Sequence, residues 1–183
     1  MFQVTIHPTV TYYKCPKCPE TATESLVFVS PDRVHDYHSV NHFTVLSIQH
    51  LRGTTAIRSS NVVQWTNGCA AQYKSKGPFS DIVHAPEDLK ATLDRNFFGS
   101  RHGKGPCDGE SAVVKNFVST AIAAGNAIIT NTHDLFQLLV ASKLTKQPPD
   151  HGCSHSLRTF FWVGENDVNL NREARKISTV PGT

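Results

Sequence analysis

Cysteine and histidine residues near the start of the chain have the types and spacing of metal ligands. Cys15 and Cys18 form a C-x-x-C pair, and His35 and His38 form an H-x-x-H pair further along. Two thiols with two imidazoles are a ligand set of structural zinc sites. A predicted strand separates the two pairs, so a proline-rich turn with free thiols is the alternative interpretation.

A second group of candidate ligands lies near the other end of the chain. His151, Cys153 and His155 alternate with other residues, but no further segment clearly completes a site with them. The chain has 5 cysteines and no secretory signal, which favours free thiols or metal ligands over a disulfide framework. A zinc site therefore stays a hypothesis with two possible locations.

A basic segment follows a predicted strand at 62–66. It turns at Asn67-Gly68 and then presents Gln72, Lys74 and Lys76. Functional residues of α/β domains often lie where a strand leads into a helix. The segment is either a phosphate-contacting loop or a plain turn with solvated lysines.

A glycine-rich basic segment at 98–108 precedes the strongest predicted helix. It contains Arg101, His102 and Lys104, and the helix that follows adds Lys115. Backbone amides and cations at a helix N-terminus attract phosphate, although such a segment can also be a structural turn. Its glycine spacing is not that of a nucleotide-binding P-loop.

Patterns of apolar residues predict the elements that position these groups. Period-2 and continuous β-favouring runs predict strands, and apolar residues at i, i+3 and i+4 predict helices. Asp108 is expected to cap the central helix, Gly53 and Gly125 to end helices, and the polar tail from Asn169 to fray. The strands expected are 2–13, 26–29, 62–66 and 157–163, and the helices are 36–52, 108–124 and 132–144. Strands interleaved with helices predict an α/β architecture.

Composition limits the classes of function. The 183 residues are 39% hydrophobic and 18% charged, which is typical of one globular domain. A formal net charge of +3 permits a polyanionic partner but does not establish one. No apolar run approaches the roughly 20 residues that span a membrane, so we expect an intracellular protein with no membrane role.

Two strings in the basic segments resemble transposon-derived proteins of animal genomes. They are 68–75 (GCAAQYKS) and 102–109 (HGKGPCDG), and 3–8 and 30–43 also have counterparts, so the resemblance covers roughly residues 3–140. It implies an RNase H-like fold in which acidic residues hold two Mg²⁺ or Mn²⁺ ions for phosphoryl transfer.

The sequence departs from this family where the metal ligands are expected. Asn67 stands where the family has aspartate, and the resemblance places another acidic residue before Gln3. Asp32, Asp108 and Glu110 are candidate metal ligands, although turn, cap and helix-dipole roles are the simpler explanation of each. The resemblance therefore implies DNA binding without catalysis.

We thus expect an α/β, RNase H-like mixed sheet flanked by helices, incomplete at its N-terminus, in one domain over 1–165 with a polar tail at 166–183. The expected function is a nuclear, transposase-derived, DNA-binding domain. The alternatives are an active fragment that uses Mg²⁺ or Mn²⁺, and a structural or zinc-stabilised protein-interaction domain. The residues expected to bind nucleic acid are Gln72, Lys74, Lys76, Arg101, His102, Lys104 and Lys115.

Overall fold

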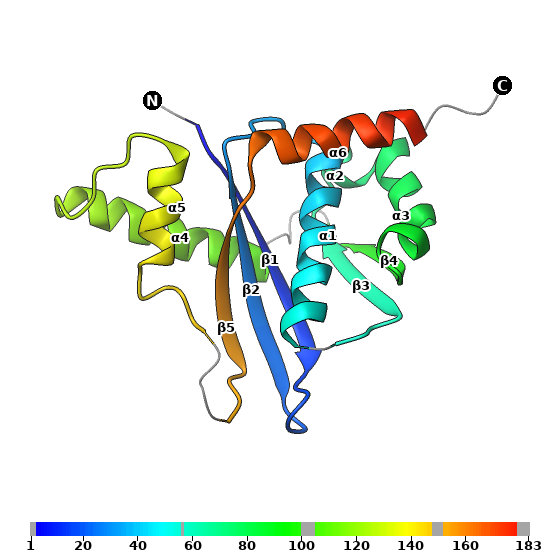
Figure 1. The fold of residues 1–183 in the computed structure, drawn as a ribbon, viewed down its shortest axis with the longest axis horizontal. Helices are drawn as coiled ribbons and strands as arrows, with labels where there is room; N and C mark the ends of the chain where they lie inside the picture. Colours follow the sequence, from blue (N-terminus) through cyan, green and yellow to red (C-terminus); the bar gives the residue numbers. More distant parts are fainter. Residues whose placement is uncertain (1–2, 56, 100–104, 148–151, 179–183) are drawn as a thin grey trace. The chain divides into compact units, whose positions relative to one another are not determined.

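The computed structural model describes residues 3–55, 57–99, 105–147 and 152–178, which form a mixed α/β fold (Figure 1). The chain divides into two compact units, and each combines two separate chain segments. Unit 1 comprises Met1–Arg33 and Lys104–Glu165, and unit 2 comprises Val34–Gly103 and Asn166–Thr183. In the sequence, residues 34–103 of unit 2 thus lie between the two segments of unit 1. One domain over 1–165 stays a prediction.

Unit 1 contains a mixed sheet of three strands. β1 (Thr5–Lys14) pairs antiparallel with β2 (Thr21–Ser30), and β5 (Ser156–Trp162) pairs parallel with the other edge of β2. Pro8 lies within β1, an edge strand of this sheet, where the missing amide hydrogen is tolerated. The predicted strands are confirmed, and β2 extends further because its polar residues also pair.

Two helices cover one face of this sheet. α4 (Pro106–Ala123) packs against β1, and α5 (Thr132–Val140) packs against β5 and β2 (Figure 1). Their apolar side chains meet the sheet in a buried apolar core. The buried members of this core are Val27, Val29, Val114, Leu135, Leu139 and Phe160.

The ends of these helices correct two predictions. Gly105, not Asp108, is the N-cap of α4, and the Asp108 carboxylate accepts a hydrogen bond of 3.0 Å from the Gly105 amide. Asp108 thus occupies the third helical position and makes one half of a capping box, since Gly105 has no side chain to make the other half. α5 ends at Val140 rather than at 144, and Gly125 follows α4 with a positive φ of 70°.

Unit 2 contains a parallel pair of strands with helices beside it. β3 (Asn61–Thr66) pairs with β4 (Thr92–Phe97). Its helices are α1 (Tyr37–Thr54), α2 (Ala70–Tyr73), α3 (Lys76–Asp88) and α6 (Glu165–Ser178). The buried apolar core consists of Ile48, Ala85, Leu89, Ala91 and Leu93.

The predicted helix at 36–52 is confirmed as α1, with one correction at its end. Asp36 is the N-cap and accepts a hydrogen bond of 2.9 Å from the Ser39 amide. Gly53 does not end the helix, because helical structure continues to Thr54 and Thr55 is the C-cap.

The C-terminal segment is the largest departure from the predicted elements. We expected a frayed polar tail from Asn169, but this segment belongs to α6. Val168 is fully buried, and Arg172 is 9% exposed with its Nε 2.9 Å from Asp36 Oδ2. Arg175 pairs with Asp81 and Asp88. The polar composition of the segment did not predict a packed helix, because Arg172 and Arg175 pair with carboxylates of unit 2 instead of facing solvent.

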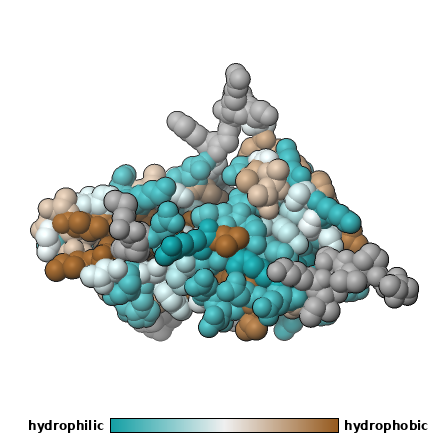
Figure 2. All heavy atoms as spheres, turned by 90° about the horizontal axis from the view of Figure 1, so that it is seen from above, coloured by the Kyte–Doolittle hydropathy of each residue, from teal (hydrophilic) through white to brown (hydrophobic). Residues whose placement is uncertain are grey.

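Figure 2 shows one face of the surface, on which hydrophilic residues predominate and apolar side chains form small groups. In the part of the chain that the structure describes, every helix is too short or too polar to cross a membrane.

Candidate metal-binding cluster and nucleic-acid edge

Strand pairing in unit 1 brings together residues from both ends of the sequence. The β1–β2 turn is closed by a hydrogen bond of 2.9 Å from the Cys15 amide to the Glu20 carbonyl. The parallel register places Thr23 opposite Ser156, and the Thr23 amide donates to the His155 carbonyl at 2.9 Å. The segment before β5 therefore lies beside the β1–β2 turn.

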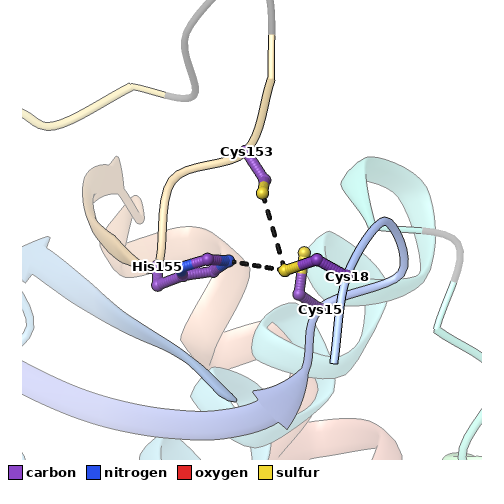
Figure 3. Close-up of side chains that lie close together, drawn as sticks. All are labelled: Cys15, Cys18, Cys153 and His155. Carbon is purple, nitrogen blue, oxygen red and sulfur yellow. Dashed lines mark hydrogen bonds between the residues drawn. The ribbon is translucent and has the colours of Figure 1, made fainter. Parts of the chain in front are cut away.

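Four side chains meet at this position, and Figure 3 shows them pointing toward one another. Cys15 and Cys18 come from the turn, and Cys153 and His155 come from the segment before β5. Cys18 Sγ lies 3.1 Å from His155 Nε2 and 3.6 Å from Cys153 Sγ. The four ligand atoms all lie within 4.8 Å of one another, so the cluster could hold a zinc ion.

The thiols of this cluster have opposite acidities. A hydrogen bond from the Lys17 amide to Cys15 Sγ, at 3.5 Å, is the main cause that lowers the pKa of Cys15 to about 6. The hydrogen bond that Cys153 makes to Cys18 is the main cause that raises the pKa of Cys153 to about 11. Without a metal, the Cys15 thiol thus ionises more readily than the Cys153 thiol.

The structure corrects the predicted zinc set at its histidines. Cys15 and Cys18 belong to the cluster, but His35 and His38 lie in unit 2. His35 is exposed before α1, whereas His38 is buried in α1 with its ring 3.9 Å from the Tyr37 ring. The register of β2 and β5 supplies the two remaining ligands instead.

The second predicted ligand group forms one site with the cysteine pair of the first group. Cys153 and His155 complete a site with the C-x-x-C pair, while His151 lies outside the described residues. Sequence spacing showed both halves but not their pairing, because 135 positions separate Cys18 from Cys153.

The two basic segments begin side by side in unit 2. Thr66 and Phe97 are partners at the carboxyl ends of β3 and β4, and the Phe98 amide donates to the Thr66 carbonyl at 3.0 Å. The Asn67-Gly68 turn and the Phe98-Gly99 segment therefore leave the same edge of the parallel pair. We call this position the carboxyl edge.

Aromatic rings and a lysine surround the carboxyl edge. Lys74 Nζ lies 4.4 Å from the centre of the Phe97 ring, and the ring centres of Trp65 and Phe98 are 5.7 Å apart. A Cβ atom added at Gly68 would lie 2.9 Å from Lys74 Nζ, so glycine allows this close approach. Trp65 is 58% exposed. The rings were not among the residues predicted from sequence, although their position beside both strings could have indicated them.

The other predicted residues after β3 lie close by in the chain. Gln72 is half-buried in α2, and Lys76 is exposed as the first residue of α3. Ser75 is the N-cap of α3 but makes no side-chain cap hydrogen bond. This hydroxyl therefore leaves the Lys76 and Gly77 amides at the start of α3 without a side-chain cap, and Pro78 at the third position has no amide hydrogen.

The predicted catalytic positions have structural partners. Asn67 Oδ1 accepts a hydrogen bond of 3.2 Å from the Cys69 amide, which makes an Asx turn. The Asp32 amide donates to Ser30 Oγ at 3.2 Å, and Asp32 is 2% exposed. The Asp108 carboxylate accepts a hydrogen bond from the Gly105 amide at the start of α4, as described above. None of these residues belongs to a cluster of three or more metal-ligand side chains within the described part of the chain.

Glu110 is held by an arginine on the neighbouring strand. Arg158 Nε lies 2.7 Å from Glu110 Oε2, and Arg158 Nη2 lies 3.0 Å from Oε1. These bonds are the main cause that lowers the pKa of Glu110. Both carboxylate oxygens are thus engaged by a cation.

The remaining predicted binding residues are not placed at the carboxyl edge. Lys115 is exposed on α4 in unit 1. Arg101, His102 and Lys104 lie outside the described residues.

Comparison with known proteins gave one match. A family model described as a domain of unknown function (DUF8701) matches residues 1–183. No curated protein and no solved structure matches the chain.

Proposed function

The chain belongs to the family described as a domain of unknown function (DUF8701), and we propose that it binds nucleic acid through the carboxyl edge of β3 and β4. The observation that carries this proposal is the hydrogen bond from the Phe98 amide to the Thr66 carbonyl, which holds the stems of the two basic segments together. Ligands of parallel α/β sheets bind beyond the carboxyl ends of the strands.

The side chains at the carboxyl edge suit a nucleic-acid partner. Lys74 and Lys76 are exposed cations within a few residues of the uncapped start of α3, where phosphate is favoured. Trp65 and Phe98 offer rings on which an unpaired base can stack. Phosphate contacts would provide affinity without sequence preference, and DNA in the nucleus is the partner that the resemblance to transposon-derived proteins implies.

The proposal includes an RNase H-like origin without catalysis. The mixed α/β order of elements supports the origin. The loss of catalysis is supported by Asn67, because an amide that accepts the Cys69 hydrogen bond brings no negative charge to a metal ion. The ion pair between Glu110 and Arg158 removes another candidate carboxylate.

Salt-dependent binding tests the proposal. Fluorescence anisotropy with labelled duplex and single-stranded DNA should show affinity that falls between roughly 50 and 200 mM salt. Lys74→Gln and Lys76→Gln should each weaken binding and reduce the slope of log K against log salt by about 0.9, the value for one phosphate contact.

Arg58→Gln is the matched control for these variants. Arg58 is an exposed cation of unit 2 that precedes the opposite end of β3, and its removal should leave affinity unchanged. Equal losses in the Arg58 and Lys74 variants would show diffuse attraction rather than a site. Absence of binding at low salt would reject the proposed function.

A nicking assay tests the loss of catalysis separately. The chain and its Asn67→Asp variant should both leave supercoiled plasmid intact in Mg²⁺ or Mn²⁺, because the carboxylates of Asp108 and Glu110 are engaged by the Gly105 amide and by Arg158. Nicking that needs the divalent ion and increases in Asn67→Asp would instead establish the active alternative.

A further inference from the structure

We infer that Cys15, Cys18, Cys153 and His155 bind one structural Zn²⁺ ion that joins the two chain segments of unit 1. The inference does not depend on the proposed nucleic-acid function, because the cluster lies in unit 1 and the carboxyl edge lies in unit 2. Three thiolates and one imidazole are an established ligand set of structural zinc.

The number of ligands decides the role of the ion. Catalytic zinc sites keep one position open for water or substrate, whereas structural sites are closed by four protein ligands. Each of the four side chains offers one ligand atom, which completes a tetrahedral shell. A set rich in thiolates also disfavours Mg²⁺, Mn²⁺ and Ca²⁺, which prefer oxygen.

The separations between ligand atoms suit a tetrahedral ion. Zn–S bonds of about 2.3 Å require sulfur atoms about 3.8 Å apart. Cys18 and Cys153 have Sγ atoms 3.6 Å apart, close to that value. Cys18 Sγ lies 3.1 Å from His155 Nε2, about 0.5 Å closer than Zn–S and Zn–N bonds would set. A disulfide would need about 2.05 Å between two sulfurs and would leave the third thiol without a role.

Hydrogen bonds of the backbone and of Lys17 hold the ligands near one another without the ion. The Cys15 amide closes the β1–β2 turn, and the Lys17 amide points at Cys15 Sγ, where it would stabilise a bound thiolate. The Thr23 amide fixes His155 through its carbonyl, and Lys17 Nζ donates to the Gly152 carbonyl at 3.0 Å. The ion would therefore enter a site that the fold has already gathered.

Zinc content of the purified chain is the first test. Mass spectrometry of the metal should give about one zinc per chain, and Cys18→Ser and His155→Ala should reduce this to near zero. Cys69→Ser and Cys107→Ser are matched cysteine controls outside the cluster, and His35→Ala is the histidine control from the other predicted set. All three controls should retain zinc.

Removal and replacement of the metal in the wild-type chain test the inference even where a variant does not fold. Removal of zinc with a chelator should lower the melting temperature by roughly 10 °C, and added Zn²⁺ should restore it. Titration of the metal-free chain with Co²⁺ should give tetrahedral d–d bands and thiolate charge-transfer bands that saturate at one ion. His155→Cys should keep this geometry and strengthen the charge-transfer bands by about a third, since four thiolates replace three.

Three results would overturn the inference. Zinc content in the wild type no higher than in Cys18→Ser would indicate free thiols. Loss of zinc from His35→Ala, with zinc retained in His155→Ala, would indicate the site predicted from sequence spacing. An octahedral Co²⁺ spectrum would indicate an open site with bound water.

Discussion

Unit 1 and unit 2 each hold together two chain segments that lie far apart in sequence, but they do so through different interactions. Unit 1 does so with the parallel pairing of β2 and β5, an apolar core and the cysteine–histidine cluster. Unit 2 attaches α6 through the ion pairs of Arg172 and Arg175. Closure of unit 1 should therefore depend on metal and packing, and closure of unit 2 on charge.

Metal removal should separate the two units most clearly. Without zinc, amide hydrogen exchange in the β1–β2 turn and in the first residues of β5 should accelerate by roughly 100-fold, equivalent to about 2.7 kcal/mol. β3 and β4 should keep their exchange rates. Hydrogen exchange with mass spectrometry measures both, and equal acceleration in the two units would break the comparison.

Truncation of the apolar core of unit 1 should have an effect of similar size. Leu139 is fully buried in unit 1, and Leu139→Ala should lower the free energy of unfolding by about 2–5 kcal/mol through lost burial and a cavity. Val140→Ala is the control, because the neighbouring Val140 is 42% exposed and should cost at most about 0.5 kcal/mol. Urea titration gives both values, and similar losses would argue against this packing.

The ion pair of α6 should have a smaller effect. Arg172→Met should destabilise the chain by roughly 1–3 kcal/mol, because the Asp36 carboxylate loses its partner in a partly buried place. Asp36→Ser keeps an N-cap oxygen for α1 while removing the charge. A double-mutant cycle from urea titrations should give a coupling energy above about 0.5 kcal/mol, whereas additive losses would mean that Arg172 acts through packing alone.

The pH dependence of unit 1 should show the smallest effect. The folded-state pKa of Glu110 is lowered by Arg158, so the stabilisation is present above the ordinary glutamate pKa and is lost as pH falls through the lowered value. Between pH 6 and 3 the wild type should lose roughly 1 kcal/mol more stability than Glu110→Gln. Urea titrations at both pH values measure this difference, and parallel losses would show that the ion pair contributes nothing.

Strong apolar patterns made much of the fold predictable. The apolar repeat of α1 and the β-favouring runs of β2, β3 and β5 identified these elements, because each has one continuous buried face. α3 and β4 were missed: Gly77, Pro78 and Pro86 interrupt the first, and charged residues occupy two of the six positions of the second. Their burial depends on contacts made only within the folded unit.

The candidate sites were predictable only in part, for a related reason. The types of ligand were evident from Cys15, Cys18, Cys153 and His155, but their pairing depends on the register between β2 and β5. No local pattern in the sequence specifies that register. At the carboxyl edge the turn at Asn67 was predictable, whereas its position beside Phe98 follows from the pairing of β3 with β4.

The separation of 135 positions between Cys18 and Cys153 also has a consequence during synthesis. At about 5–20 residues per second, a ribosome needs roughly 7–27 s to add the later ligands after the earlier pair. Cys15 and Cys18 stay exposed to oxidants during that interval, and a disulfide between them would block metal entry. The yield of correctly folded protein from cell-free translation should therefore depend on a thiol reductant that is present while the chain is being synthesised.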